Sequence, residues 1–455
     1  MPSHLILQRL GKAIEAEFRA APYRSQRALA RRSRVRELEA LAQHKLQVPD
    51  ILHFIWIGAP AALDSHYLTI WKAANPDKTL WLWHDPQVSQ CQHFQARLMA
   101  YARKISPHAP QATLRQLQNA AFRFIWPRLA HPELTFNALA ERFLYQIAAE
   151  KTTFPAAQGQ ASLPAGVELM EITPLFHGAQ APLKRLYYYE LILRGNLASA
   201  SDIVRLLVLN RYGGIYIDID TLPCLDTVFP RTHRLLETLN LRHDEAIALA
   251  KSERALAALL QDDAAAQSSA ERIDTHPFLS PRMRCRLKAC MHADTHTLHI
   301  GKIPALGAVF SWRDWVTQSS TPALDGIYYS NVLACCPQAR VLRLTLRTLN
   351  KRYRFLERRD AIFHVPHSEG ITHSLARLLG WREEGLKGDY GITPALTGPG
   401  LLLEVQLAAA LRVLGIEKTV APHFLAVFMQ HPRLGAAFVK HTLDTPLGLR
   451  SAWRR

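Results

Sequence analysis

The stretch RYGGIYIDID, residues 211–220, decides the fold class of this chain. Isoleucine occupies every second position from 215 to 219, and two aspartates, Asp218 and Asp220, alternate with these isoleucines. A period of two is typical of a β-strand with one apolar face and one polar face. We therefore predict a half-buried strand whose open face carries both carboxylates.

The residues just before this strand predict a buried helix that leads directly into it. In NLASASDIVRLLVLNRYGG, residues 196–214, a serine at 199 or 201 can cap a helix and Gly213 can end it. Because the residues between are apolar nearly all round, we expect this helix to lie in the core. Asp202 and Arg205 stand three positions apart and share one helix face. Taken alone, the pair predicts an ordinary ion pair; beside the two aspartates, it can also bind sugar hydroxyls and phosphate oxygens.

Three further segments predict strands. VPDILHFIWIGAP, residues 48–60, and KTLWLWHD, residues 78–85, are apolar runs with a short helix at about 71–75 between them. A strand, a helix and a second strand at this spacing are typical of a parallel βαβ unit. GIYYSNVLACCP, residues 326–337, predicts another strand that leads into a basic helix over 338–352. Together these segments predict an α/β fold.

The remaining segments predict helices. We expect helical insertions over about 90–182 and 231–300, and a turn followed by a helix over 392–415. Residues 1–47 predict a basic helical segment with ten Lys and Arg against four Glu, and 48–455 form the larger unit. This N-terminal segment is either a helical cap packed on the larger unit or an electrostatic contact to an anionic membrane surface or a partner.

The composition indicates a folded protein with an anionic partner. The 455 residues are 48% hydrophobic and 20% charged, and the formal net charge is +17. Such a charge suits nucleic acid, acidic lipid or a phosphorylated substrate. The basic segments lack interleaved aromatic residues of the kind that stack on bases, so we expect no nucleic acid. Cys285 and Cys290, with the histidines after them, fit no usual zinc spacing.

The sequence predicts neither a secretory signal nor a membrane span. The N-terminus lacks an uninterrupted apolar core, and charged residues interrupt the most apolar region, 401–428. No C-x-x-C pair occurs among the six cysteines. We therefore expect a soluble or peripheral intracellular protein with reduced cysteines.

The two aspartates predict a metal site. A pair of carboxylates beyond an apolar strand offers the hard oxygen ligands that Mg²⁺ or Mn²⁺ prefers. Such ions keep some ligand positions for substrate phosphates. With Asp202 and Arg205 on the preceding helix, the site predicts a nucleoside diphosphate that is bound through a metal.

These motifs resemble a known family. ASDIVRLLVLNRYGGIYIDIDTLPCLD, residues 200–226, resembles the core of the DXD-containing glycosyltransferases typified by the clostridial glucosylating toxins and including bacterial effector glycosyltransferases. The shared pattern is an S-D-x-x-R helix, a Y-G-G turn and a strand that ends in D-x-D. The segments ILHFIWIGAP, NPDKTLWLWHD, YYSNVLACCP and TGPG (397–400) resemble further blocks of that family. The resemblance implies a GT-A-type, Rossmann-like fold over 48–455.

The resemblance implies a role for each motif residue. For the donor site these roles are as follows: Trp56 stacks on uracil, Asp202 binds donor hydroxyls, Arg205 contacts the sugar or diphosphate, Asp218 bridges ribose and the metal shell, Asp220 ligates the metal, and Asn331 orients the sugar. Ser451 and Trp453 match an S-x-W element that closes over the diphosphate. The family places a glutamate ligand three residues before that serine. Gly448 stands there in this chain, which leaves Asp444 or His441 as a candidate third ligand.

The resemblance also implies a reaction. It is the retaining transfer of a sugar, glucose or N-acetylglucosamine, from a UDP-sugar with Mn²⁺ or Mg²⁺. The motifs contain no obvious nucleophile, so front-side displacement is expected. The expected acceptor is a host protein, reached after translocation into a host cell, as for toxin-like effectors. The alternatives are synthesis of a bacterial surface glycan and a non-catalytic basic binding module with a degenerate transferase core.

Overall fold

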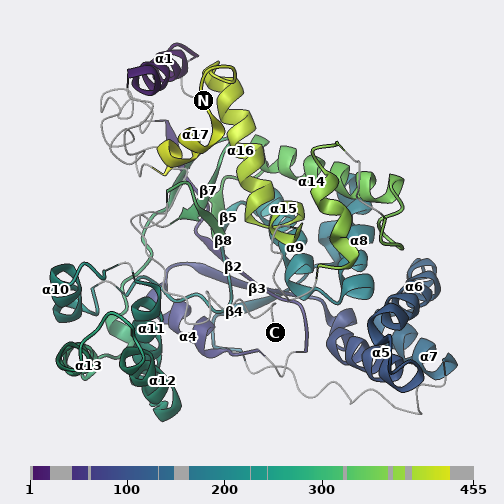
Figure 1. The fold of residues 1–455 in the computed structure, drawn as a ribbon, viewed down its shortest axis with the longest axis horizontal. Coiled ribbons are helices and arrows are strands. Elements are labelled where there is room, and N and C mark those ends of the chain that lie inside the picture. The colour runs from purple at the N-terminus through teal and green to yellow at the C-terminus, as the bar shows by residue number, and fades with distance from the viewer. Residues whose placement is uncertain are drawn as a thin grey trace.

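A six-stranded mixed sheet forms the centre of the molecule (Figure 1). The computed structural model describes residues 4–20, 44–59, 63–131, 133–147, 163–225, 227–242, 244–320, 325–366, 372–384 and 392–430. The strand order is β4-β3-β2-β5-β8-β7. The strands are β2 Ile51–Trp56, β3 Thr79–His84, β4 Val167–Glu171, β5 Gly214–Ile217, β7 Val316–Ser320 and β8 Tyr328–Cys335.

Four neighbouring strands of this sheet are parallel. β2 pairs in parallel with β3 and β5, and β3 pairs in parallel with β4. β8 runs antiparallel to both β5 and β7. Helix α4 (His66–Ala74) connects β2 to β3, which confirms the predicted βαβ unit and the α/β class.

The strand with the alternating isoleucines ends sooner than the sequence predicts. β5 stops at Ile217, and all four of its residues are buried because it lies between β2 and β8. Its isoleucines pack in one core, and Tyr216 packs in a second core on the other face. The prediction of an open strand face that carries both aspartates is therefore wrong. Asp218 and Asp220 lie just beyond the strand, where the chain leaves the sheet.

Helices cover the sheet and extend beyond it. They are α1 His4–Ala20, α5 Cys91–Ile105, α6 Pro110–Arg128, α7 Phe136–Gln146, α8 Ala181–Tyr188, α9 Leu197–Tyr212, α10 Pro230–Thr238, α11 Glu245–Leu260, α12 Asp263–Asp274, α13 Pro281–Thr295, α14 Arg340–Arg358, α15 Ile392–Leu396, α16 Pro399–Leu414 and α17 Pro422–Met429. α9 is the buried helix that the sequence predicts, and Gly213 ends it. Its N-cap is Asn196 and not a serine, because the Asn196 side chain accepts a hydrogen bond from the Ser199 N–H at 2.9 Å.

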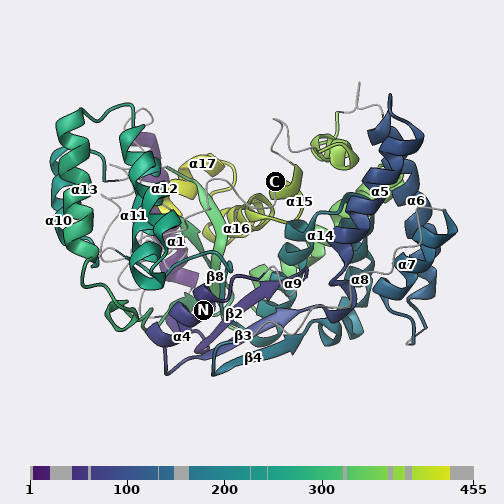
Figure 2. The ribbon, with the colours of Figure 1, turned by 90° about the horizontal axis from the view of Figure 1, so that it is seen from below.

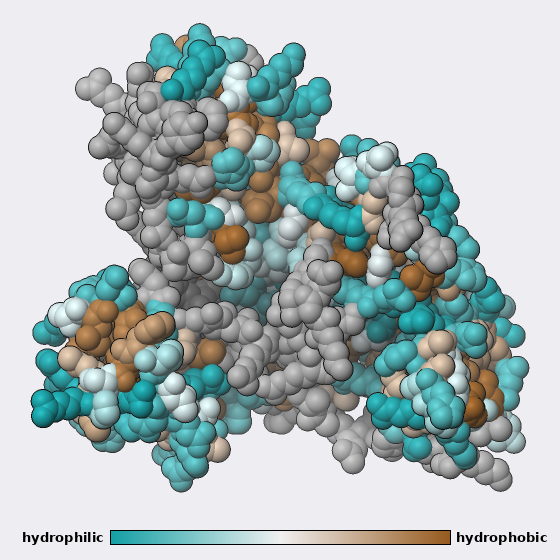
Figure 3. Space-filling view, in the orientation of Figure 1, coloured by the Kyte–Doolittle hydropathy of each residue, from teal (hydrophilic) through white to brown (hydrophobic). Residues whose placement is uncertain are grey.

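Two groups of helices project from the sheet as separate lobes (Figures 1 and 2). One contains α5, α6 and α7, between β3 and β4. The other contains α10–α13, which follow β5 and share a separate hydrophobic core with α4. Hydrophilic side chains cover much of both lobes in the view of Figure 3. The range 90–182, assigned from the sequence to a helical insertion, also contains β4, which is an edge strand of the sheet.

Helix α1 packs against the C-terminal end of α16. Leu10 and Ile14 are buried in the main core, and Gly11 lies so close to the Leu414 carbonyl that an added Cβ would stand 2.4 Å from its oxygen. The rest of the basic segment lies outside the described residues up to position 43, and β1 (Lys45–Gln47) then pairs with β6 (Phe310–Trp312).

One stretch in the described part of the chain has the length and composition of a membrane span. It is Ile392–Leu414, and half of its most apolar window is buried inside the protein. Its Glu404 pairs with Arg352 and Arg377.

Candidate active site

The predicted donor-site residues meet where the chain order of the parallel strands reverses. β3 and β4 extend the sheet on one side of β2, and β5 lies on the other side. Ligands of open α/β sheets bind beyond the carboxyl ends of the strands at such a position. Trp56 is the last residue of β2, and Asp218 directly follows β5. Asn331 lies on β8, and its carbonyl accepts a hydrogen bond from the Asp218 N–H at 2.8 Å.

Arg205 joins the helix to the strand end. Its Nη2 lies 2.7 Å from Asp202 Oδ1, and its Nη1 lies 3.5 Å from Asp218 Oδ1. Nη1 also donates to the Ser330 carbonyl at 2.7 Å. The guanidinium carbon stands 4.5 Å from the centre of the Tyr216 ring. The predicted pairing of Asp202 with Arg205 is therefore present. The buried Arg205 guanidinium contacts both Asp202 and Asp218.

The Asp218 carboxylate has side-chain partners in the described part of the protein, whereas the Asp220 carboxylate has no side-chain hydrogen-bond donor there. Tyr216 donates its hydroxyl hydrogen to Asp218 Oδ1 at 2.5 Å. Asp220 accepts no hydrogen bond from another described side chain, and burial together with the nearby Asp218 charge raises the pKa of Asp220 to about 6. Two carboxylates that repel each other at a strand end form a donor set that suits a divalent cation. Within the described residues, no group of three histidine, cysteine or acidic side chains completes such a site.

A turn far along the sequence contacts Asp202. The Thr397 hydroxyl donates to Asp202 Oδ2 at 2.8 Å, and its oxygen lies 2.9 Å from the Ser199 hydroxyl. Gly398 follows, and a Cβ at that position would stand 3.4 Å from the same carboxylate oxygen. Burial raises the pKa of Asp202 to about 6, although Arg205 and the Thr397 hydrogen bond oppose this rise. The TGPG turn is thus part of the site.

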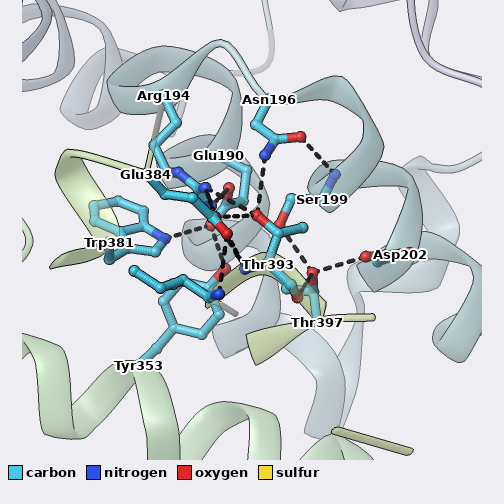
Figure 4. A network of polar contacts seen from close by, with 11 residues as sticks. Glu190, Arg194, Asn196, Ser199, Asp202, Tyr353, Trp381, Glu384, Thr393 and Thr397 are labelled. Atoms are coloured by element: carbon cyan, nitrogen blue, oxygen red, sulfur yellow. Dashed lines mark hydrogen bonds and ion pairs between the residues drawn. The ribbon is translucent and has the colours of Figure 1, made fainter. Parts of the chain in front are cut away.

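A network of buried polar side chains supports this turn (Figure 4). The Glu384 carboxylate accepts from the backbone N–H of Ile392 at 3.0 Å and of Thr393 at 2.8 Å, which caps the start of α15. Arg194 donates to Glu384 at 2.5 Å and to the Thr393 hydroxyl at 2.9 Å. The Thr393 carbonyl in turn accepts the Thr397 N–H at 3.0 Å.

The second carboxylate of the network is fully buried. Glu190 lies in the π-helical run Tyr189–Arg194, and its Oε2 accepts from Arg194 at 2.8 Å. Its Oε1 accepts from the Tyr353 hydroxyl at 2.5 Å and from the Trp381 indole at 2.8 Å. These partners come from α14 and from the 3₁₀ helix Ala376–Arg382, so the network ties three distant segments to the helix that carries Asp202.

The Y-G-G turn is fixed by a buried histidine. His53 accepts the Trp83 indole hydrogen on Nδ1 at 3.1 Å, so its Nε2 carries the proton that it donates to the Gly213 carbonyl at 2.8 Å. Burial lowers the pKa of His53 to about 4. Gly213 and Gly214 have φ values of +66° and +88°, the region that favours glycine.

Two predicted residues have side-chain partners within the protein, and three predicted residues lie beyond the described chain. Trp56 is partly buried, and its indole N–H donates to the Ala59 carbonyl at 2.9 Å. The Asn331 side-chain oxygen accepts from the Ser319 hydroxyl. Asp444, Ser451 and Trp453 fall within 431–455, outside the described residues.

Sequence reasoning did not foresee three contacts of the site, although Thr397 belongs to the TGPG block that it quoted. Tyr216, Ser330 and Thr397 contact the predicted aspartates or Arg205. Tyr216 stands two residues before Asp218, so the strand alternation could have indicated their contact. Ser330 and Thr397 offered no such signal, because they are distant from their partners along the chain.

Two families match the chain across this site. Residues 164–363 match the family described as "TcdA/TcdB catalytic glycosyltransferase domain". Residues 63–233 match "Glycosyltransferase sugar-binding region containing DXD motif". These two matches identify a glycosyltransferase domain that is similar to those of the clostridial toxins.

Curated toxins resemble this glycosyltransferase domain over part of its length. Toxin A of Clostridium novyi is 25% identical over 213 residues, which are 42% of this chain and 10% of that protein. Cytotoxin-L of Paraclostridium sordellii is 26% identical over 195 residues, 38% of this chain and 8% of that protein. Toxin B of Clostridioides difficile is 55% identical over 38 residues. The matched parts thus span 10% or less of these toxins.

Solved structures share the fold of the glycosyltransferase domain. The catalytic domain of alpha-toxin from Clostridium novyi superposes with a TM-score of 0.65 at 15% identity, over 99% of this chain and 89% of that one. The UDP-bound glycosyltransferase domain of the YGT toxin gives a TM-score of 0.54 at 16% identity, over 83% and 81%. The fold is therefore the GT-A-type α/β fold that the sequence predicts.

Proposed function

We propose that this chain transfers a sugar, glucose or N-acetylglucosamine, from a UDP-sugar to a host protein, with retention of configuration and dependence on Mn²⁺ or Mg²⁺. The observation that carries the proposal is the cluster of Asp202, Arg205 and Asp218, with Asp220 beside it, beyond the strands of a toxin-type glycosyltransferase sheet. A UDP-bound relative of the same fold supports the nucleotide part of the donor.

Each residue has a task in this proposal. Trp56, at the end of β2, stacks on uracil, and Asp202 receives the donor hydroxyls. Arg205 offsets the charges of Asp202 and Asp218 and stabilises the diphosphate. Asn331 orients the sugar from β8. Asp218 and Asp220 would hold the metal ion, which would supply positive charge to stabilise the leaving diphosphate.

The C-terminal residues complete the proposed site. Ser451 and Trp453 close over the diphosphate and exclude water, and Asp444 is the candidate third metal ligand. The N-terminal segment over 1–47 contacts an anionic membrane surface in this proposal. Ten Lys and Arg against four Glu support that contact.

Donor turnover tests the proposal directly. Purified protein is incubated with labelled UDP-glucose or UDP-N-acetylglucosamine, with Mn²⁺, Mg²⁺ or EDTA, and with or without host-cell lysate. We expect metal-dependent release of UDP and a labelled host protein. Absence of UDP binding and turnover with both donors would show a non-catalytic module. Labelling of a lipid-linked or bacterial glycan in place of host protein would show surface-glycan synthesis.

A further inference from the structure

Helix α14 carries one uninterrupted row of positive charges on its exposed face. We call this set the α14 cation row: Arg340, Arg343, Arg347, Lys351, Arg354 and Arg358. Consecutive members are three or four residues apart, so they are neighbours along one side of the helix. All six side chains belong to exposed residues.

The row has no acidic counterpart in the described part of the chain. None of its six members forms an ion pair there, although surface charges of mixed sign usually alternate along solvated helices. Glu357, the acidic residue within α14, instead contacts Arg185 at 3.0 Å and Tyr189 at 3.0 Å. Like charges at this spacing destabilise a helix. The row therefore opposes the folding of α14.

The opposite face of α14 holds the helix in place. Leu342, Leu349 and Leu356 are fully buried in the main core. Arg352 lies on the inner face of α14 and, unlike the members of the row, has an acidic partner. It pairs with Glu404 at 2.5 Å and donates to the Ala395 carbonyl. Within one helix, the inward cation is neutralised and the outward cations are not. Packing accounts for the inner face but not for the outer one.

We propose that the α14 cation row is a docking surface for an anionic phospholipid membrane. A straight row on a convex helix can place all its charges against a flat anionic surface at once, over roughly 27 Å from the first member to the last. Clusters of basic residues with several members are sufficient for such electrostatic binding. Nucleic acid is disfavoured because the aromatic residues of α14, Tyr353 and Phe355, are buried and cannot stack on bases.

Vesicle binding with matched charge variants tests this assignment. The row variant is Arg343→Gln/Arg347→Gln/Lys351→Gln. The control is Arg103→Gln/Arg282→Gln/Arg286→Gln, which removes three exposed cations from α5 and α13. Both variants lose three charges, so a difference between them reports position and not net charge. Binding is measured to vesicles of phosphatidylcholine alone and with 30 mol% phosphatidylserine, at physiological ionic strength.

We expect the wild type and the control to bind phosphatidylserine vesicles within twofold of each other, and the row variant to bind at least tenfold more weakly. Its melting temperature is expected to be equal or higher, because like-charge repulsion is relieved. Equal losses in both variants, or equal binding of the wild type to neutral vesicles, would overturn the proposal. A lower melting temperature would assign the row to stability. Row-dependent binding to an RNA oligonucleotide without vesicle binding would assign it to nucleic acid.

Discussion

The two DXD aspartates differ in what surrounds each carboxylate. Asp218 accepts from Tyr216 and lies near Arg205, whereas Asp220 has no described side-chain donor. We expect Asp218→Asn and Asp220→Asn each to reduce UDP-sugar hydrolysis at least 100-fold, measured as UDP release. Asp220→Asn should leave the melting temperature within about 2 °C. Asp218→Asn should lower it more, because Arg205 loses a partner. Near wild-type turnover in either variant would contradict the assigned roles.

The Thr397 hydroxyl adjusts the Asp202 carboxylate. Its hydrogen bond lowers the Asp202 pKa, which burial has raised to about 6. Thr397→Val removes this hydrogen bond at nearly constant volume, so the Asp202 pKa rises further. As the pH falls, UDP-sugar turnover should therefore be lost at a higher pH than in the wild type. We expect the acidic limb of the kcat/KM profile to move up by up to about one pH unit. Thr397→Ser is the control and should restore the wild-type profile; an unmoved limb in Thr397→Val would separate Thr397 from catalysis.

Local spacing explains which site residues the sequence could identify. Asp202 and Arg205 are one helical turn apart, so their contact follows from helix geometry. Thr397 reaches Asp202 from 195 residues away, and Arg194 contacts Glu384 over 190 residues. Such contacts depend on how the segment from Glu384 to Thr397 packs against the segment from Arg194 to Asp202. A short-range pattern contains no information about that packing.

At the scale of elements, the entry into β5 tolerates no side chain at Gly214. Its φ is +88°, and an added Cβ would stand 2.8 Å from the Ile51 carbonyl oxygen and 2.9 Å from His53 Nε2. We expect Gly214→Ala to lower the free energy of unfolding by about 2–4 kcal/mol, from backbone strain and overpacking. Gly178→Ala is the control, since it has φ of +59° with open space around it. Denaturant unfolding measures both, and equal losses would remove the packing argument.

His53 links β2 and β3 to this turn and makes their packing sensitive to acid. Its pKa is about 4 in the folded protein and 6.5 ordinarily, so the unfolded chain binds the proton more readily. The stability it contributes is complete above pH 6.5 and is lost as the pH falls toward 4. Between pH 7 and pH 5 the wild type should lose about 2 kcal/mol more than His53→Gln, measured by urea unfolding. Parallel pH dependences in the two proteins would contradict a neutral buried histidine.

The strands differ in how readily the sequence identifies them. β2 and β3 are continuous apolar runs because both lie inside a parallel sheet. β4 carries Glu168 and Glu171 at the sheet edge and has mostly exposed or half-exposed residues, so its sequence lacks a strand-like apolar pattern. The alternation around β5 correctly indicates opposite faces for its isoleucines and Tyr216. It could not show that a second core covers the polar face.

At the scale of the whole molecule, α1 is an attachment to the end of α16 that lies opposite the site. It contacts Leu414, whereas the TGPG turn forms the other end of α16, which begins at Pro399. Deleting residues 1–20 should therefore retain UDP-sugar hydrolysis within about threefold. The melting temperature should fall, because burial of Leu10 and Ile14 contributes about 1.5–3 kcal/mol each. Loss of turnover in protein that remains folded would instead connect α1 to the site.

The antiparallel pairing of β5 with β8 restricts how this domain can diverge. The Asp218 N–H bond to the Asn331 carbonyl continues the ladder that pairs Ile217 with Val332. The backbone therefore sets the spacing between the proposed metal ligand Asp218 and the proposed sugar-binding residue Asn331. Adding or removing one residue between Asn331 and Cys335 would turn Asn331 to the other face of the sheet. Relatives with other donor preferences should therefore differ here by substitution and not in length. Insertions should accumulate in the helical lobes, where no strand pairing fixes the spacing of the proposed donor-site residues.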